Sequence, residues 1–242
     1  ALHFTRSDLI RYTSIMRKFK FENTSIYHLY NRGVEKRTIF LNDEDYYRFI
    51  HNLYEFNNEA PAENVYYRKL YEVGPHKINK AQLVKIHAFC LMPNHFHLLL
   101  RQTKDNGIQT FMKKIGTGYA MYFNQKYQRV GGLFQGRFKA VRVERNEHLS
   151  YLHYYIHLNP LGLIESEWKK NEIKDINKVI EFLESYRWSS YLDYIGKKNF
   201  PSVINKEFLL ELIESPEKYK KNIIEWLKEK NLTDITSSVL LD

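Results

Sequence analysis

The sequence predicts an α+β fold in which helices cover one face of an antiparallel sheet. Strand-like runs rich in β-branched and aromatic residues alternate irregularly with stretches that carry apolar residues at helical spacing. Two of the strand-like runs are separated by only three residues, which indicates a hairpin and antiparallel pairing. The chain shows no internal repeat, phosphate-binding loop or dinucleotide-binding fingerprint that would favour another class.

The first strand and the first helix have clear local signals. Residues 26–31 are rich in β-branched and aromatic side chains and are followed by Gly33, which predicts a strand. Asn42 offers an N-cap before an acidic turn, and apolar side chains then recur every three or four positions. This pattern predicts an amphipathic helix that ends near Asn57.

A hairpin is predicted by two apolar runs, residues 83–91 and 95–101. The connection between them contains Pro93 and Asn94. Both residue types suit a tight turn, because proline fixes φ and asparagine tolerates turn geometry.

The next segment predicts one helix and one extended run. Apolar residues recur at helical spacing over residues 108–123, although Gly116 and Gly118 weaken the middle of that helix. After a glycine pair, residues 133–143 are expected to be extended.

Helices dominate the rest of the chain. One is predicted from an N-cap at Asn146 to the residue before Pro160. Beyond it the composition is rich in Lys and Glu, which indicates a helical extension. Its helices are predicted around residues 175–184, 206–214 and 216–230.

The chain is large enough for a proper core, with 242 residues of which 43% are hydrophobic. Cys90 is its single cysteine, so no internal disulfide is possible, and no secretory signal is recognisable; a cytoplasmic location is expected. We expect residues 1–15 to be a vector-derived leader before a natural start at Met16. Residues 16–192 then form the main domain, and residues 193–242 form the helical extension.

Two compositional values are unusual. The formal net charge is +9, from 37 Lys and Arg against 28 Asp and Glu, and 15% of the residues are aromatic. Together they suit a binder of single-stranded nucleic acid, because cations pair with phosphates and flat rings stack on unpaired bases. General solubility and core packing explain the same values, so composition leaves both interpretations open.

His95 and His97 form the sharpest local motif. Side chains two apart on a strand point to the same face, so two imidazoles can converge on one metal ion while Phe96 points to the other face. The apolar run that follows indicates a central strand. Histidines that are satisfied by structural hydrogen bonds are the alternative, and on the motif alone the more common one.

Tyr155 and Asn159 form a second pair, four positions apart at the end of the helix predicted before Pro160. Four helical residues bring two side chains onto nearly the same face, about 6 Å apart along the axis. The helix can therefore present a phenol and an amide oxygen together. Core packing of Tyr155 and a helix-terminal role for Asn159 are the alternative.

These motifs occur with others in a fixed order along the chain. They are LMPNHFHLL at residues 91–99, GLFQGRFK at residues 132–139 and YIHLNP at residues 155–160, together with YHLYNRG at residues 27–33 and RWSSY at residues 187–191. In this order they resemble the single-tyrosine HUH transposases of the insertion-sequence-200 type, and most closely their REP-associated tyrosine transposase branch. The resemblance covers roughly residues 25–192.

The resemblance implies a ferredoxin-like or RRM-like antiparallel sheet with helices packed on it, and a metal-dependent DNA transposase. In that family a tyrosine attacks single-stranded DNA near a hairpin, which leaves a 5′-phosphotyrosine link and a free 3′-hydroxyl without ATP. Carried over, Tyr155 is the nucleophile, and His95, His97 and Asn159 are the metal ligands. Two nitrogens and one neutral oxygen leave positions for phosphate and water, which favours Mg²⁺ or Mn²⁺ over a structural Zn²⁺.

The positive charge is concentrated between Arg101 and Arg145. This segment contains ten Lys and Arg residues and only two Asp and Glu residues, so it accounts for +8 of the formal net charge of +9. Part of this segment lies between the expected ligands and Tyr155, where it can guide the scissile strand. The residues expected to contact DNA are Arg137, Lys139, Arg142 and Arg145, with Arg32, Lys36 and Arg37 as secondary candidates. The expected partner is single-stranded DNA with a hairpin, which implies association with the nucleoid, and a homodimer is compatible with the family.

Two other functions are open to a chain of this kind. The first is a domesticated protein that keeps the fold and the basic surface and binds hairpins without cutting them. The four expected site residues argue against it. The second is an unrelated metal hydrolase, which is disfavoured because no carboxylate accompanies the histidine pair in a recognisable ligand motif.

Overall fold

The structure is a computed structural model that describes residues 20–61, 81–144, 146–165, 173 and 175–228. The expected leader, residues 1–15, and Met16 lie outside these ranges. In the described part of the chain, a βαββαβ unit is followed by a series of helices. No helix there is long and apolar enough to cross a membrane.

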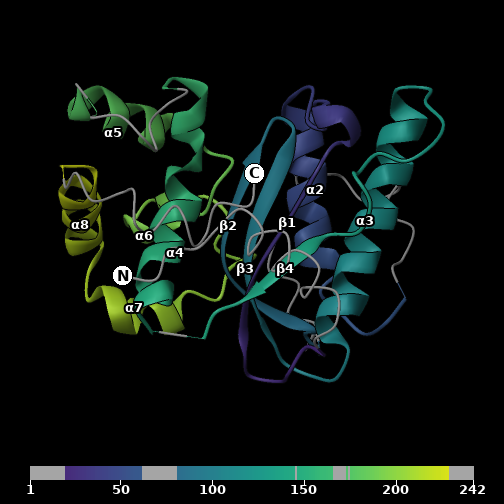
Figure 1. Ribbon diagram of the computed structural model, residues 1–242, viewed down its shortest axis with the longest axis horizontal. Helices are drawn as coiled ribbons and strands as arrows, with labels where there is room; N and C mark the ends of the chain where they lie inside the picture. Colours follow the sequence, from purple (N-terminus) through teal and green to yellow (C-terminus); the bar gives the residue numbers. More distant parts are fainter. Residues whose placement is uncertain (1–19, 62–80, 145, 166–172, 174, 229–242) are drawn as a thin grey trace, which may run out of the picture.

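A four-stranded antiparallel sheet forms the centre of the molecule (Figure 1). Its strands are β1 (Ile26–Arg32), β2 (Val84–Met92), β3 (His95–Gln102) and β4 (Lys139–Arg142), in the order β2-β3-β1-β4. The predicted first strand and the predicted hairpin are confirmed. The order is that of a ferredoxin-like sheet, and it makes β3 and β1 the central strands and β4 a short edge strand.

One face of the sheet is covered by α2 (Asp43–Glu55) and α3 (Gly107–Lys126). Phe49 of α2 packs on Phe96 of β3, with ring centroids 4.9 Å apart. The predicted N-cap of α2 is confirmed, since the side chain of Asn42 accepts a hydrogen bond from the Asp45 backbone N–H. Gly118 does not interrupt α3. A Cβ there would lie 2.5 Å from the Phe56 ring, so a glycine allows that ring to pack against the helix.

The opposite face is covered by α4 (Asn146–Leu158), which packs against β2 and β3 (Figure 1). The expectation that helices cover only one face is therefore wrong. The physical reason is visible in β3, where Leu98, Leu99 and Leu100 are consecutive and all fully buried. Because neighbouring residues of a strand point to opposite faces, such a run has to be covered on both sides.

In the described part of the chain, the elements beyond α4 are helical, as predicted. Its elements are the 3₁₀ helix η3 (Asn159–Leu163), α5 (Ile176–Ser185), α6 (Tyr191–Tyr194), α7 (Glu207–Ile213) and α8 (Pro216–Lys228). The helix α6 was not predicted, because four residues are too few to show a period. Of the expected extended run over residues 133–143, only β4 is a regular strand. Gly136, with φ at +74°, lies in the loop before it.

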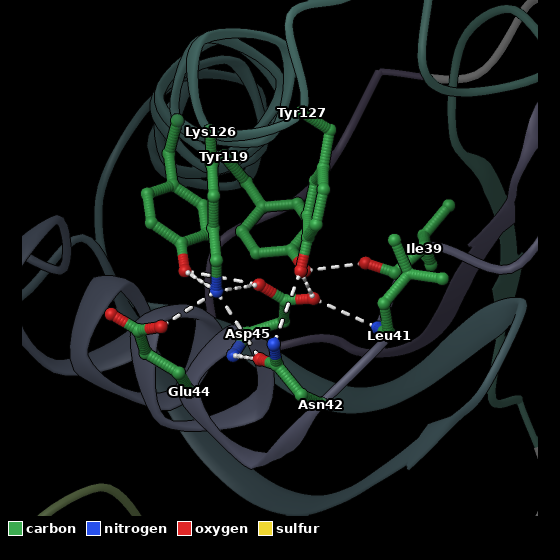
Figure 2. A network of polar contacts seen from close by, with 9 residues as sticks. Ile39, Leu41, Asn42, Glu44, Asp45, Tyr119, Lys126 and Tyr127 are labelled. Carbon is green, nitrogen blue, oxygen red and sulfur yellow. Dashed lines mark hydrogen bonds and ion pairs between the residues drawn. The ribbon is translucent and has the colours of Figure 1, made fainter.

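A cluster of charged and phenolic groups joins α2 to α3 (Figure 2). The fully buried carboxylate of Asp45 accepts hydrogen bonds from Lys126, Tyr122 and Tyr127 at 2.8–3.0 Å, and from the backbone N–H of Leu41 at 2.8 Å. Burial lowers the pKa of Lys126, but the hydrogen bonds of its ammonium to Asp45, Glu44 and Tyr122 outweigh burial. The net shift of the pKa is therefore upward, and the ammonium stays charged. The cluster therefore fixes the start of α2 against the end of α3.

Candidate active site

The two predicted histidines lie together on one face of β3. Their ring centroids are 5.0 Å apart, and the rings are nearly perpendicular. His97 is buried at the centre of the sheet, where Tyr30 of β1 and Cys90 of β2 are its cross-strand neighbours. His95 lies half-buried at the start of the strand, beside the hairpin turn. The same-face arrangement predicted from their spacing is what the structure shows.

Tyr155 of α4 lies beside His97 and His28. Its ring centroid lies 5.8 Å from that of His97 and 6.2 Å from that of His28, and both contacts are edge-on. The tyrosine is almost completely buried, with 5% of its surface exposed. The helix that covers the second face of the sheet thus brings this tyrosine beside His97 of the same chain.

Asn159 directly follows α4 at the first position of η3 and is buried. Its Nδ2 donates to the carbonyl oxygen of Tyr155 at 2.9 Å, so the two residues stay close although the α-helix ends between them. The four-residue spacing therefore brings the Asn159 side chain to the backbone of Tyr155, and the predicted pairing of its amide oxygen with the phenol stays a prediction.

Two further side chains contact the histidine pair through its Nδ1 atoms. The Oδ1 of Asn94 lies 2.6 Å from Nδ1 of His95. The Nε2 of His28, on β1, lies 2.9 Å from Nδ1 of His97, and the two rings are stacked at 5.1 Å. In the sequence, His28 falls within the first predicted strand and Asn94 within the predicted hairpin turn. The alternation of His28 with Tyr30 on a strand was the available signal.

His95, His97 and Asn159 offer two imidazole nitrogens and one amide oxygen as candidate donors for a divalent cation. In the described part of the chain, no three His, Cys, Asp or Glu side chains come together to hold a metal ion. A ligand set built on His95 and His97 therefore needs a third donor of another kind, such as the amide oxygen of Asn159. Two imidazoles and one amide leave coordination positions open for phosphate and water, as Mg²⁺ and Mn²⁺ require.

Two of the expected DNA-contacting cations share the histidine face of the sheet. Lys139 of β4 pairs with Tyr30, and its Nζ lies 5.6 Å from the Tyr30 ring centroid. Arg32 pairs with His95 across β1 and β3, and its Nε donates to Gln135 at 2.5 Å. The row Lys139, Tyr30, His97 thus runs from an exposed edge to the centre of the site.

Among the other expected DNA-contacting residues, one lies on the opposite face of the sheet and three are exposed or partly exposed. Arg142 pairs with Tyr27 on the opposite face of the sheet, where its guanidinium lies 2.6 Å from Glu22. Arg137 and Lys36 are exposed, and Arg37 is partly exposed. Arg145 lies outside the described residues.

The helix that carries Tyr155, α4, also forms hydrogen bonds with α8 and with Ser190. The fully buried His157 lies 2.6 Å from the Tyr219 hydroxyl of α8 and 2.7 Å from the Ser190 hydroxyl. Burial keeps the pKa of His157 well below its ordinary value, so this imidazole is neutral. The Tyr154 hydroxyl accepts from Asn222 of α8 at 3.1 Å. Tyr154 and His157 therefore have packing roles, and Tyr155 alone of the three faces His97.

Comparisons with known proteins place this geometry in context. A family model described as "Transposase IS200 like" matches residues 25–159. No curated protein matches the chain. A solved structure described as the REP-associated tyrosine transposase bound to a REP hairpin is similar at 12% sequence identity, with a TM-score of 0.45. The match covers 78% of this chain and 89% of that one.

Proposed function

Because the chain belongs to the family of IS200-like transposases, we propose that it cleaves and rejoins single-stranded DNA beside a hairpin, with Tyr155 as the nucleophile. The family implies a DNA transposase or nuclease. The observation that supports the finer proposal is the edge-on contact of Tyr155 with His97, which brings a phenol to one of the two proposed histidine ligands. The sequence motifs resemble those of the REP-associated branch of this family.

The chemistry is a transesterification. The phenolic oxygen of Tyr155 forms a bond to phosphorus and gives up its proton, while the bond from phosphorus to the 3′ oxygen breaks and that oxygen is protonated. One phosphodiester replaces another, so no ATP is consumed. A divalent cation, Mg²⁺ or Mn²⁺, held by His95, His97 and Asn159 would neutralise phosphate charge and orient the scissile bond.

The residues of this chain position the reactants. α4 brings Tyr155 to the sheet, and its buried contacts with α8 restrict the movement of the phenol. Lys139 and Arg32 flank the site on the same face and are the cations best placed to bind the phosphates of the scissile strand. Since the phenol and the histidines belong to one chain, we propose a site completed in cis.

The test is the covalent adduct. Wild-type protein, Mn²⁺ and a 3′-end-labelled hairpin oligonucleotide with single-stranded flanks are expected to give a labelled protein band in a denaturing gel. Tyr155→Phe is expected to abolish this band and leave hairpin binding largely intact. Tyr154→Phe is the matched control, because its hydroxyl contacts α8 instead of the site, and it is expected to form the adduct.

The outcome decides between the two candidate functions. An adduct that persists in Tyr155→Phe shows that Tyr155 is not the nucleophile. Wild-type protein that binds the hairpin and never forms an adduct, with either Mn²⁺ or Mg²⁺ and flanks of either polarity, is instead a non-cleaving hairpin-binding protein.

A further inference from the structure

We propose that Asn94 and His28 are positioning residues that fix which ring nitrogen of each ligand histidine faces the metal ion. The inference rests on the proposed function, in that His95 and His97 are taken as ligands. Each contact engages an Nδ1 atom, which leaves Nε2 of both histidines as the atom for the metal. A ligand histidine whose second nitrogen is held by a partner keeps its tautomer and its ring orientation.

The contact of Asn94 determines the tautomer of His95. The Nδ2 of Asn94 donates to the Lys36 carbonyl oxygen at 3.2 Å, so its Oδ1 is the atom that faces His95. An amide oxygen only accepts. The Nδ1 of His95 therefore carries the hydrogen, and its Nε2 keeps the lone pair that a metal ion needs.

The loop before α2 holds Asn94 in this position. The Asn94 carbonyl accepts from the Gly33 N–H at 2.8 Å, and the Pro93 carbonyl accepts from the Ile39 N–H at 2.8 Å. Lys36, whose carbonyl orients the amide, has a left-handed φ of 59°, a conformation that is costly for a lysine. The surrounding hydrogen bonds therefore maintain a strained turn whose carbonyl orients the Asn94 amide.

His28 is the corresponding partner of His97. A distance of 2.9 Å between the two nitrogens permits either ring to donate. Only one arrangement leaves a lone pair on Nε2 of His97, namely a hydrogen on Nδ1 of His97 that is accepted by Nε2 of His28. The stacking of the rings and the burial of both histidines restrict any rotation that would exchange these roles.

Metal affinity of the full chain tests the proposal. Asn94→Ala and His28→Leu are each expected to weaken Mn²⁺ binding 10–100-fold in calorimetric titrations without DNA, because the ligand rings lose their orientation. Asn94→Asp and His28→Gln keep an acceptor at or near the lost atom and are expected to restore most of the affinity. The matched controls are Asn205→Ala and His87→Leu, which disturb β2 away from the site and are expected to leave Mn²⁺ affinity unchanged.

A second measurement does not depend on variants that fold. Long-range ¹⁵N–¹H spectra of metal-free wild-type protein, at a pH where the rings are neutral, are expected to show hydrogen on Nδ1 of both His95 and His97. Hydrogen on Nε2 of either residue overturns the proposal. So does unchanged Mn²⁺ affinity in both Asn94→Ala and His28→Leu.

The two proposals fail in different ways. If wild-type protein shows neither Mn²⁺ binding nor an adduct, the proposed function fails, while the spectra still decide whether the two rings have the expected tautomers. If wild-type protein binds Mn²⁺ and forms the adduct but the tautomers differ, only the positioning role is wrong.

Discussion

At the scale of single residues, the alternation of side chains along a strand places cations that are close in sequence on opposite faces of the sheet. Lys139 and Arg142 both lie on β4, three positions apart, and therefore on opposite faces. Lys139 lies beside Tyr30 in the row that leads to His97, whereas Arg142 is bound to Glu22 on the far face. Charge concentration along the sequence could not distinguish the two, because it does not show which face a side chain joins.

This difference predicts the effect of two substitutions. Lys139→Ala is expected to weaken binding of single-stranded DNA and to reduce the slope of log K against log salt by about 0.7, the value for one lost phosphate contact. Arg142→Ala is expected to change neither quantity. Fluorescence anisotropy titrations over a range of salt concentrations measure both, and equal effects of the two variants would contradict the assignment of faces.

At the scale of elements, the buried carboxylate of Asp45 is the main polar link between α2 and α3. Asp45→Ala leaves the Lys126 ammonium and two phenols without their shared acceptor, so a loss of about 3–5 kcal/mol of unfolding free energy is expected. Glu44→Ala removes a half-exposed partner of the same ammonium and is expected to cost less than about 1 kcal/mol. Urea denaturation measures both. Similar losses would show that the buried carboxylate has no special role.

The elements themselves were largely predictable from sequence. α2, the β2–β3 hairpin and the helices of the extension follow from apolar period, an N-cap and turn residues. The second covered face was not predicted, because a continuous apolar run such as Leu98-Leu99-Leu100 shows burial but not the element that covers it. The spacing of His95 and His97 predicted their common face. The contacts of His28 and Asn94 could not be predicted, because they depend on strand register and on the conformation of a strained loop.

At the scale of the whole molecule, stability is expected to fall at mildly acidic pH. Burial lowers the pKa values of His87 and His153 to about 4, from 6.5. Between those values the unfolded chain binds a proton at each site and the folded chain does not, so lowering the pH favours unfolding. From pH 7 to pH 5, each histidine contributes a loss of about 2 kcal/mol.

Chemical denaturation at several pH values checks this expectation. His153→Gln is expected to flatten the dependence of unfolding free energy on pH by the contribution of one histidine, whatever its effect at pH 7. Asn222→Ala is the control. It removes a polar contact between α4, which carries His153, and α8, but it does not remove a group that titrates between pH 5 and pH 7. An unchanged pH dependence in His153→Gln would mean that this imidazole takes up a proton as readily in the folded protein as in the unfolded chain.

The position of Cys90 opposite His97 has a consequence for the chemical durability of the site. A thiolate next to two imidazoles would be a soft ligand that attracts Zn²⁺ or Cu⁺ and reacts with peroxide. Burial raises the pKa of the Cys90 thiol, and the side chain is fully shielded from solvent. The sulfur is therefore expected to remain an inert filler in the sheet, which neither binds a soft metal ion nor reacts with peroxide.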